Sequence, residues 1–270
     1  MGFAIRRPFG NTGRRVCPIG ISSGYGLDAD GVEEAVDGGV NYLFNSAPRK
    51  KSFCEGIRRV SRKNREDLII VLQSYWRSFL GGLQNRSIER GLDALGLDYV
   101  DVMVLGWFNK RPPKKLIDGA LKLKEEGKVK LLGLSTHKRK IVPELATEGD
   151  FQVFHVRYNA AHRGAEYDIF PHVDPSTGPG MVAFTATRWG HLLNPKKMPP
   201  GEKPLRASDT YRFCLTSPHI HTIATGPKNR DQLKEALLAI EKGPLDQDEM
   251  ARIRKIGDHV YGKKTLMGRE

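Results

Sequence analysis

The stretch Val40-Asn41-Tyr42-Leu43-Phe44-Asn45-Ser46-Ala47 decides the fold. Its residues 42–45 are typical of a short β-strand, and they follow a stretch, 29–38, in which apolar residues recur at the three- and four-residue spacing of a helix. The same alternation of short β-branched runs and helical stretches continues along the chain. This pattern indicates repeated βα units around a parallel sheet.

Eight runs are expected to be strands, and they are 16–19, 42–45, 68–73, 100–105, 129–134, 151–157, 181–185 and 221–225. Five stretches are expected to be helices, and they are 29–38, 53–61, 87–95, 114–126 and 232–241. Asp30 and Ser87 each stand where a helix is expected to begin, and each has a side-chain oxygen that can cap it.

The 270 residues match the size of one (β/α)8 barrel, typically about 250 residues. No linker rich in Pro, Gly or Ser and no low-complexity tract divides the chain, so one domain over residues 1–270 is expected. Two segments rich in Pro, Gly and Lys, 172–179 and 194–207, are expected to be either flexible surface loops or loops that cover a substrate.

The net charge of +13 and the pI near 9.7 favour anionic ligands such as phosphate compounds, nucleic acid or anionic membranes. No nucleic-acid-binding motif and no interleaving of basic and aromatic residues is found, so nucleic acid is not expected as a partner. No run approaches the roughly 18 apolar residues of a membrane span, and no secretory signal begins the chain. We therefore expect a cytoplasmic protein.

Metal and disulfide chemistry are not expected. Cys17, Cys54 and Cys214 are odd in number and widely spaced, without a C-x-x-C pair or a histidine at ligand spacing. Free thiols in a reducing compartment explain them.

Several segments, taken in their order along the chain, resemble the aldo-keto reductases. Besides the opening stretch they are NTGRRVCPIG at 11–20, AVDGGVNY at 35–42, LDYVDVMVLGW at 97–107, LLGLSTH at 131–137 and IATGPKNRDQL at 223–233. The resemblance implies an α/β fold of the (β/α)8 TIM barrel type, which binds NADP(H) across the carboxyl ends of its strands. It also implies hydride transfer to a carbonyl. A tyrosine supplies the proton, a lysine and an aspartate tune that tyrosine, and a histidine orients the substrate oxygen.

The four catalytic positions carry other residues in this chain. The aspartate's position falls on Asn45, the tyrosine's on Lys50, the lysine's on Gln73 and the histidine's on Gly106. Lys50 is either an ammonium in the pocket, serving as proton donor or anion clamp, or a solvated loop residue. Tyr75 is either a relocated acid or an aromatic residue of the pocket rim. Ordinary aldehydes and ketones are expected to be reduced slowly.

The cofactor side of the family pattern is better preserved. By resemblance, Ser135 lies near the nicotinamide carboxamide, Phe184 stacks on that ring, and Thr136 and His155 occupy positions where amide side chains are common. The resemblance also assigns the adenosine 2′-phosphate to a loop and helix start formed by Gly226, Lys228, Asn229 and Gln232. A lysine before a helix amino terminus suits a phosphate, although Lys228 could also be one surface cation among many.

Two functions are therefore considered. The first is a divergent, NADP(H)-binding oxidoreductase with altered or weak carbonyl-reducing activity on a small-molecule substrate. The second is a catalytically silent nucleotide-binding regulatory protein that responds to a small-molecule effector. In both cases we expect one pocket at the carboxyl ends of the strands, lined by Asn45, Gln73, Trp107, Ser135, His155 and Phe184.

Overall fold

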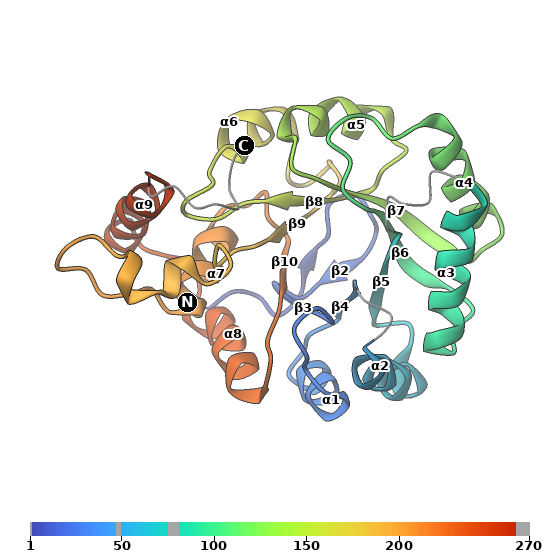
Figure 1. The fold of residues 1–270 in the computed structure, drawn as a ribbon, viewed down its shortest axis with the longest axis horizontal. Coiled ribbons are helices and arrows are strands. Elements are labelled where there is room, and N and C mark those ends of the chain that lie inside the picture. The colour runs from blue at the N-terminus through green and yellow to red at the C-terminus, as the bar shows by residue number, and fades with distance from the viewer. Residues whose placement is uncertain (1, 47–49, 75–80, 263–270) are drawn as a thin grey trace.

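The computed structural model describes residues 2–46, 50–74 and 81–262. Eight parallel strands close into a barrel in the order β10-β3-β4-β5-β6-β7-β8-β9, with helices around its outside (Figure 1). The strands are β3 (Ile19–Ser22), β4 (Tyr42–Asn45), β5 (Ile69–Ser74), β6 (Val100–Leu105), β7 (Val129–Thr136), β8 (Val153–Arg157), β9 (Gly180–Phe184) and β10 (Thr222–Thr225). The expected (β/α)8 barrel is confirmed.

Nine α-helices fall within the described ranges. They are α1 (Ala29–Asp37), α2 (Lys51–Asn64), α3 (Gly81–Leu95), α4 (Lys114–Glu125), α5 (Val142–Glu148), α6 (Ala165–Asp168), α7 (Ala207–Thr216), α8 (Arg230–Lys242) and α9 (Gln247–Gly262). Four 3-10 turns are η1 (Arg139–Ile141), η2 (Phe170–His172), η3 (His191–Leu193) and η4 (Pro195–Lys197). No helix in these ranges is long and apolar enough to cross a membrane.

A short hairpin closes the amino end of the barrel. Its strands, β1 (Arg7–Pro8) and β2 (Arg15–Val16), pair antiparallel. Between them Phe9 enters the barrel interior and contacts the rings of Tyr42 and His221 at 5.8 and 6.0 Å. This plug fills the amino end of the barrel interior.

Three local expectations are wrong. The first barrel strand is Ile19–Ser22 rather than 16–19, because Arg15–Val16 belongs to the hairpin. Helix α3 begins at Gly81, so Ser87 lies inside it and caps nothing. The cap of α1 is Asp28, whose Oδ1 accepts a hydrogen bond from Gly31 N at 2.8 Å, and not Asp30. Asp30 instead lies in the first helical turn, where its charge suits the helix dipole.

Side chains alternate strictly between the two faces of the barrel wall. Residues of one set fill the barrel interior, among them Tyr42, Ile69, Val71, Val102, Val104, Val153 and Val182. Their neighbours, such as Leu43, Ile70, Leu72, Met103 and Phe154, pack outward against the helices. This alternation determines which residues at the strand ends can face a ligand in the mouth of the barrel.

Candidate functional site

Asn45 lies on the outer face of β4. It shares that face with Leu43, and its Nδ2 donates to the Sγ of Cys54 on α2 at 3.4 Å. Its Oδ1 is buried and has no hydrogen-bond partner in the described part of the chain. The last inward-facing residue of β4 is Phe44, which packs against the interior cluster. Phe44 therefore occupies the place in the mouth that the sequence assigned to Asn45.

Gln73 and Ser135 do face the interior. Gln73 alternates with Ile69 and Val71 on β5 and is 8% exposed, and Ser135 follows Leu131 by four residues on β7 and is 5% exposed. Gly106 directly follows β6, and its N–H donates to the Ser74 carbonyl at 2.8 Å. The Ser135 hydroxyl on β7 and the Gln73 amide on β5 thus reach the mouth of the barrel.

The floor of the mouth is a buried pair of Tyr42 and His155. The Tyr42 hydroxyl and His155 Nε2 lie 2.7 Å apart, and the Phe44 ring contacts His155 at 4.9 Å. Burial raises the pKa of Tyr42 and lowers the pKa of His155 to about 3. Both groups are therefore neutral at ordinary pH. Nε2 of His155 is hydrogen-bonded to the Tyr42 hydroxyl below the mouth.

A chain of aromatic rings crosses the rim. The ring of His137, just after β7, contacts Trp107 at 6.2 Å and Phe184 at 5.4 Å, both edge to face. Trp107 is 57% exposed and Phe184 ends β9 on its interior face. Burial and the nearby positive charge of Arg157, the last residue of β8, lower the pKa of His137. The rim thus offers flat apolar surfaces beside an arginine.

The remaining candidates are Lys50, Tyr75 and the cofactor-binding candidate Thr136. Lys50 is exposed at the amino end of α2, and its side chain makes no cap hydrogen bond. Tyr75 lies outside the described residues. The Thr136 hydroxyl accepts a hydrogen bond from Lys138 N at 2.9 Å and so closes the turn after β7.

A cavity of about 570 Å³ opens beside the mouth, between the loops after β9 and β10 and the first turns of α7 and α8. Its wall is formed by Tyr25, Thr185, Ala186, Thr187, Trp189, Gly190, Leu193, Leu205, Arg206, Ala207, Tyr211, Ala224, Thr225, Gly226, Pro227, Lys228, Gln232 and Glu235. Three of the four residues that the sequence assigned to a phosphate line it. A Cβ at Gly226 would lie 2.0 Å from the Tyr25 ring, so any other residue there would displace that ring.

The fourth assigned residue, Asn229, builds the loop. Its Oδ1 accepts from Gln232 N at 3.0 Å, and Oε1 of Gln232 accepts from Lys228 N at 2.9 Å. These reciprocal bonds cap α8 and leave the Lys228 side chain exposed, without an ion pair to any described residue. Lys228 is therefore available to an anion at the amino end of α8.

The loop after β9 is strained. Thr185, Arg188 and Trp189 have φ values of 55°, 50° and 52°, in the left-handed region that costs a non-glycine residue about 1–3 kcal/mol. Asn159 Nδ2 donates a hydrogen bond to the Thr185 carbonyl at 2.9 Å, and the Arg188 guanidinium donates one to the Val260 carbonyl. Such strain often marks ligand sites, and two of these three residues, Thr185 and Trp189, line the cavity.

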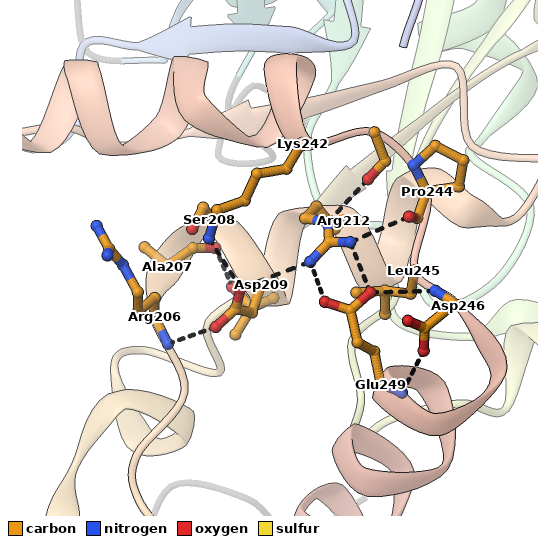
Figure 2. A network of polar contacts seen from close by, with 12 residues as sticks. Arg206, Ala207, Ser208, Asp209, Arg212, Lys242, Pro244, Leu245, Asp246 and Glu249 are labelled. Atoms are coloured by element: carbon orange, nitrogen blue, oxygen red, sulfur yellow. Dashed lines mark hydrogen bonds and ion pairs between the residues drawn. The ribbon is translucent and has the colours of Figure 1, made fainter. Parts of the chain in front are cut away.

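A buried arginine fixes the wall supplied by α7. Arg212 donates to the Gly243 and Pro244 carbonyls at 2.8 and 3.0 Å and forms two bonds of 2.6 Å to the Glu249 carboxylate. Figure 2 shows Arg212 reaching from α7 toward the turn after α8 and toward α9. The network holds the start of α7 in place at the cavity.

An ion pair borders the same cavity. The Arg206 guanidinium is bound to the Glu235 carboxylate, which also accepts from Ser208 N at 3.1 Å. Burial raises the pKa of Glu235, but the hydrogen bonds from Arg206 and Ser208 outweigh it and hold that pKa at about 2. Of the cations that line this cavity, Arg206 is therefore neutralised and Lys228 is not.

Sequence interpretation missed Phe44, Tyr42 and the aromatic residues Tyr25 and Trp189. The period of two along β4 carried a usable signal, since an inward Tyr42 requires an inward Phe44. No comparable signal marked Tyr25 or Trp189, because both lie in irregular loops that only the tertiary structure brings together.

Comparisons with known proteins agree with this architecture. Residues 31–209 match the model of the Aldo/keto reductase family. The structure is similar to the holo form of the aldo-keto reductase AKR11C1 from Bacillus halodurans, with a TM-score of 0.76, 19% identity and coverage of 95% of this chain and 96% of that chain. It is also similar to the thermostable aldo-keto reductase Tm1743 bound to the inhibitor epalrestat, with a TM-score of 0.75, 20% identity and coverage of 94% and 100%. No curated protein matches the sequence significantly.

Proposed function

The chain belongs to the aldo/keto reductase family, and from that premise we propose that it is an NADP(H)-dependent oxidoreductase with altered or weak activity on carbonyl compounds. The observation that carries this proposal is the cavity of about 570 Å³ whose wall contains Gly226 and Lys228. It lies against the carboxyl ends of β9 and β10, where a barrel of this kind binds its ligands.

The residues present fit such a cofactor. Lys228 offers an exposed cation at the amino end of α8, so the loop suits an adenosine phosphate, and Gly226 beside it leaves room for the Tyr25 ring. The Thr185 hydroxyl is a buried group without a partner among the described residues, and Thr185 is one of the residues that line the cavity. Next to it Phe184 offers a ring for the nicotinamide, and Ser135 offers a hydroxyl for the carboxamide.

When bound, the nicotinamide supplies a hydride to the carbonyl carbon or accepts one in the reverse reaction. The protein's task is then to orient the carbonyl and to manage one proton. Gln73 can donate a hydrogen bond to a substrate oxygen from the interior face of β5. Since Phe44 faces the mouth and Asn45 is turned toward Cys54, β4 gives the reaction no carboxylate. Slow turnover follows from this arrangement.

A catalytically silent nucleotide-binding protein is the second candidate. It is favoured by the exposed position of Lys50 and by the outward position of Asn45, because neither side chain then serves a reaction in the mouth. In this case the cofactor would stabilise or signal rather than react.

One experiment in two steps tests both candidates. Melting temperature is measured with NADPH, with NADH and without ligand; binding at 100 times Kd should add about 2.7 kcal/mol of stability. NADPH consumption is then followed with a panel of aldehydes and ketones. Binding with slow turnover supports the oxidoreductase, and binding without turnover supports the silent protein. No stabilisation by either nucleotide rejects both.

A further inference from the structure

The cavity beside β9 and β10 has a fixed negative charge in its wall. Glu235 follows Gln232 by three residues on α8, so the two side chains share one face of that helix, and both residues line the cavity together with Lys228. The Glu235 side chain is 22% exposed. Hydrogen bonds from Arg206 and Ser208 hold its pKa at about 2 in spite of its burial, so it is ionised at ordinary pH. The wall that would receive a phosphate therefore carries a carboxylate as well as an ammonium.

Arg206 compensates this carboxylate from the segment before α7. Its Nε donates to Oε1 of Glu235 at 3.2 Å and its Nη2 donates to Oε2, so the contact is bidentate. Oε1 also accepts from Ser208 N at 3.1 Å, which fixes the carboxylate against the start of α7. Arg206 lines the same cavity. While the pair is intact its charges cancel, and among the described residues that line the cavity only Lys228 then contributes a net charge.

The carboxylate is close enough to the start of α8 to act on a phosphate there. Helix α8 begins at Arg230, and an α-helix rises about 1.5 Å per residue, so Glu235 lies roughly 8 Å along the axis from that end. The Debye length at physiological ionic strength is also about 8 Å, so the charge of Glu235 is only partly screened over this distance. Without Arg206 it would repel a phosphate bound at Lys228.

We propose that the Arg206–Glu235 pair determines the choice between NADPH and NADH. Arg206 cancels the repulsion between Glu235 and the 2′-phosphate of NADPH, so that the attraction of Lys228 prevails. This inference rests on the proposed function, since it assigns roles within the nucleotide cavity. Arg206 acts through Glu235 and is a positioning residue rather than a catalytic one. NADH has no 2′-phosphate, so its affinity should depend little on the pair.

A double-mutant cycle measures the effect. Isothermal titration calorimetry gives Kd for NADPH and NADH, and also for 2′,5′-ADP and 5′-AMP, two fragments that differ only in the 2′-phosphate. Arg206→Met leaves the carboxylate uncompensated and should lower the affinity for NADPH relative to NADH about three- to tenfold, as for charges roughly 8 Å apart near a protein surface. Glu235→Gln releases the charge of Arg206 and should raise this ratio by a similar factor. The double variant should return to the ratio of the unmodified protein.

Further variants separate charge from structure. Arg206→Lys keeps the positive charge and should keep most of the preference, and all differences should shrink as salt is added. The matched control is Arg252→Met. Arg252 is paired with Glu202 at 3.0 Å with similar exposure, but neither residue is among the described residues that line the cavity. This control should leave the ratio of the two affinities unchanged.

The outcomes distinguish this inference from the function beneath it. An unchanged ratio in Arg206→Met, or an equal loss for both nucleotides, means that the arginine only holds the start of α7; this overturns the inference and leaves NADP(H) binding intact. A lower ratio in Glu235→Gln overturns it as well, and this variant decides alone if Arg206→Met does not fold. If none of the four ligands binds to the unmodified protein, the proposed function fails and the inference fails with it.

Discussion

Lys228 is the residue on which the choice of cofactor depends. Its exposed ammonium stands at the amino end of α8 without an ion pair among the described residues, whereas Arg206 across the cavity is bound to Glu235. NADPH should therefore bind more tightly than NADH. Lys228→Glu should reduce that preference by tenfold or more, because a charge-assisted hydrogen bond is worth about 1.5–3 kcal/mol.

The measurement is a fluorescence titration with each nucleotide. Lys234→Glu provides the control, since it makes the same charge change on the exposed face of the same helix without touching the cavity. Equal affinity of the unmodified protein for NADPH and NADH would count against this phosphate site.

His155 makes stability depend on pH. Burial lowers its pKa to about 3, while a histidine in an unfolded chain titrates near 6.5. Between these values the unfolded chain binds a proton that the folded protein does not. The free energy of unfolding should therefore be fully kept above pH 6.5 and fall as the pH is lowered toward 3, by up to about 1.4 kcal/mol per pH unit from this group.

Urea unfolding of the unmodified protein and of His155→Gln, from pH 8 to 4.5, measures this contribution. Glutamine keeps a partner for the Tyr42 hydroxyl but binds no proton, so the variant should have a shallower slope. His172→Gln, at an exposed position, should keep the original slope. Parallel curves for the unmodified protein and His155→Gln would show that His155 is not buried as a neutral group.

Phe44 and Asn45 show what the sequence could and could not predict about the site. The position of β4 was correct, but a shift of one residue turns a side chain to the other face of a sheet. The resemblance assigned the catalytic position to Asn45, while packing puts Phe44 inward and Asn45 beside Cys54. An aspartate placed at 45 would thus be buried against α2, away from the mouth.

At the scale of elements, Arg212 ties α7 to the turn after α8 and to α9 (Figure 2). It is 6% exposed and supplies donors to two backbone carbonyls and one carboxylate. Arg212→Met should leave these acceptors unpaired and lower the free energy of unfolding by about 2 kcal/mol or more. NADPH binding should weaken as well, because the first turn of α7 forms a wall of the cavity.

Denaturant unfolding and NADPH titration measure the two effects. The control is Arg252→Met, which removes a more exposed arginine paired with Glu202 at 3.0 Å and should cost less than about 1 kcal/mol. Equal stabilities of Arg212→Met and Arg252→Met would mean that the buried network contributes no more than a surface ion pair.

Helices α7 and α9 were not predicted from the sequence, and the reason differs between them. In α7, residues Ser208 to Leu215 include buried side chains on every side, polar and apolar alike, apart from the half-buried Asp209. A helix buried all round has no amphipathic period to find. In α9, by contrast, Ile253, Ile256 and Val260 recur at helical spacing and are buried on one face. The signal for α9 was present, whereas α7 depends on its tertiary surroundings.

The strands were predicted more accurately, because a parallel barrel buries both faces of each strand and leaves continuous apolar runs. The cavity could not be predicted in the same way. Its wall comes from the loops after β3, β9 and β10 together with the starts of α7 and α8, segments up to 210 positions apart from Tyr25 to Glu235. Only closure of the barrel brings them together.

At the scale of the whole molecule, α9 braces the loops on one side of the barrel. Arg254 pairs with Glu166 at 2.7 Å, Asp258 pairs with Arg163 at 2.7 Å, and the Val260 carbonyl accepts from Arg188 of the strained loop after β9. The helix also buries three branched aliphatic side chains, each worth about 1.5–3 kcal/mol. Together the three buried side chains contribute a large part of a typical free energy of unfolding of about 5–15 kcal/mol.

Close packing at Gly257 makes this brace testable with a single methyl group. A Cβ at Gly257 would lie 2.1 Å from the Ala160 carbonyl oxygen, so the backbone must shift, whereas a Cβ at Gly262 of the same helix meets nothing within 4 Å. Gly257→Ala should destabilise the protein by about 1–3 kcal/mol through overpacking, although alanine favours a helix. Gly262→Ala should be neutral or slightly stabilising.

Gly257→Ala should also weaken NADPH binding, because α9 holds the loop that carries Thr185 and Trp189. Denaturant unfolding measures the effect on stability, and nucleotide titration measures the effect on binding. Unchanged binding in a destabilised Gly257→Ala would mean that the cavity keeps its shape without the brace.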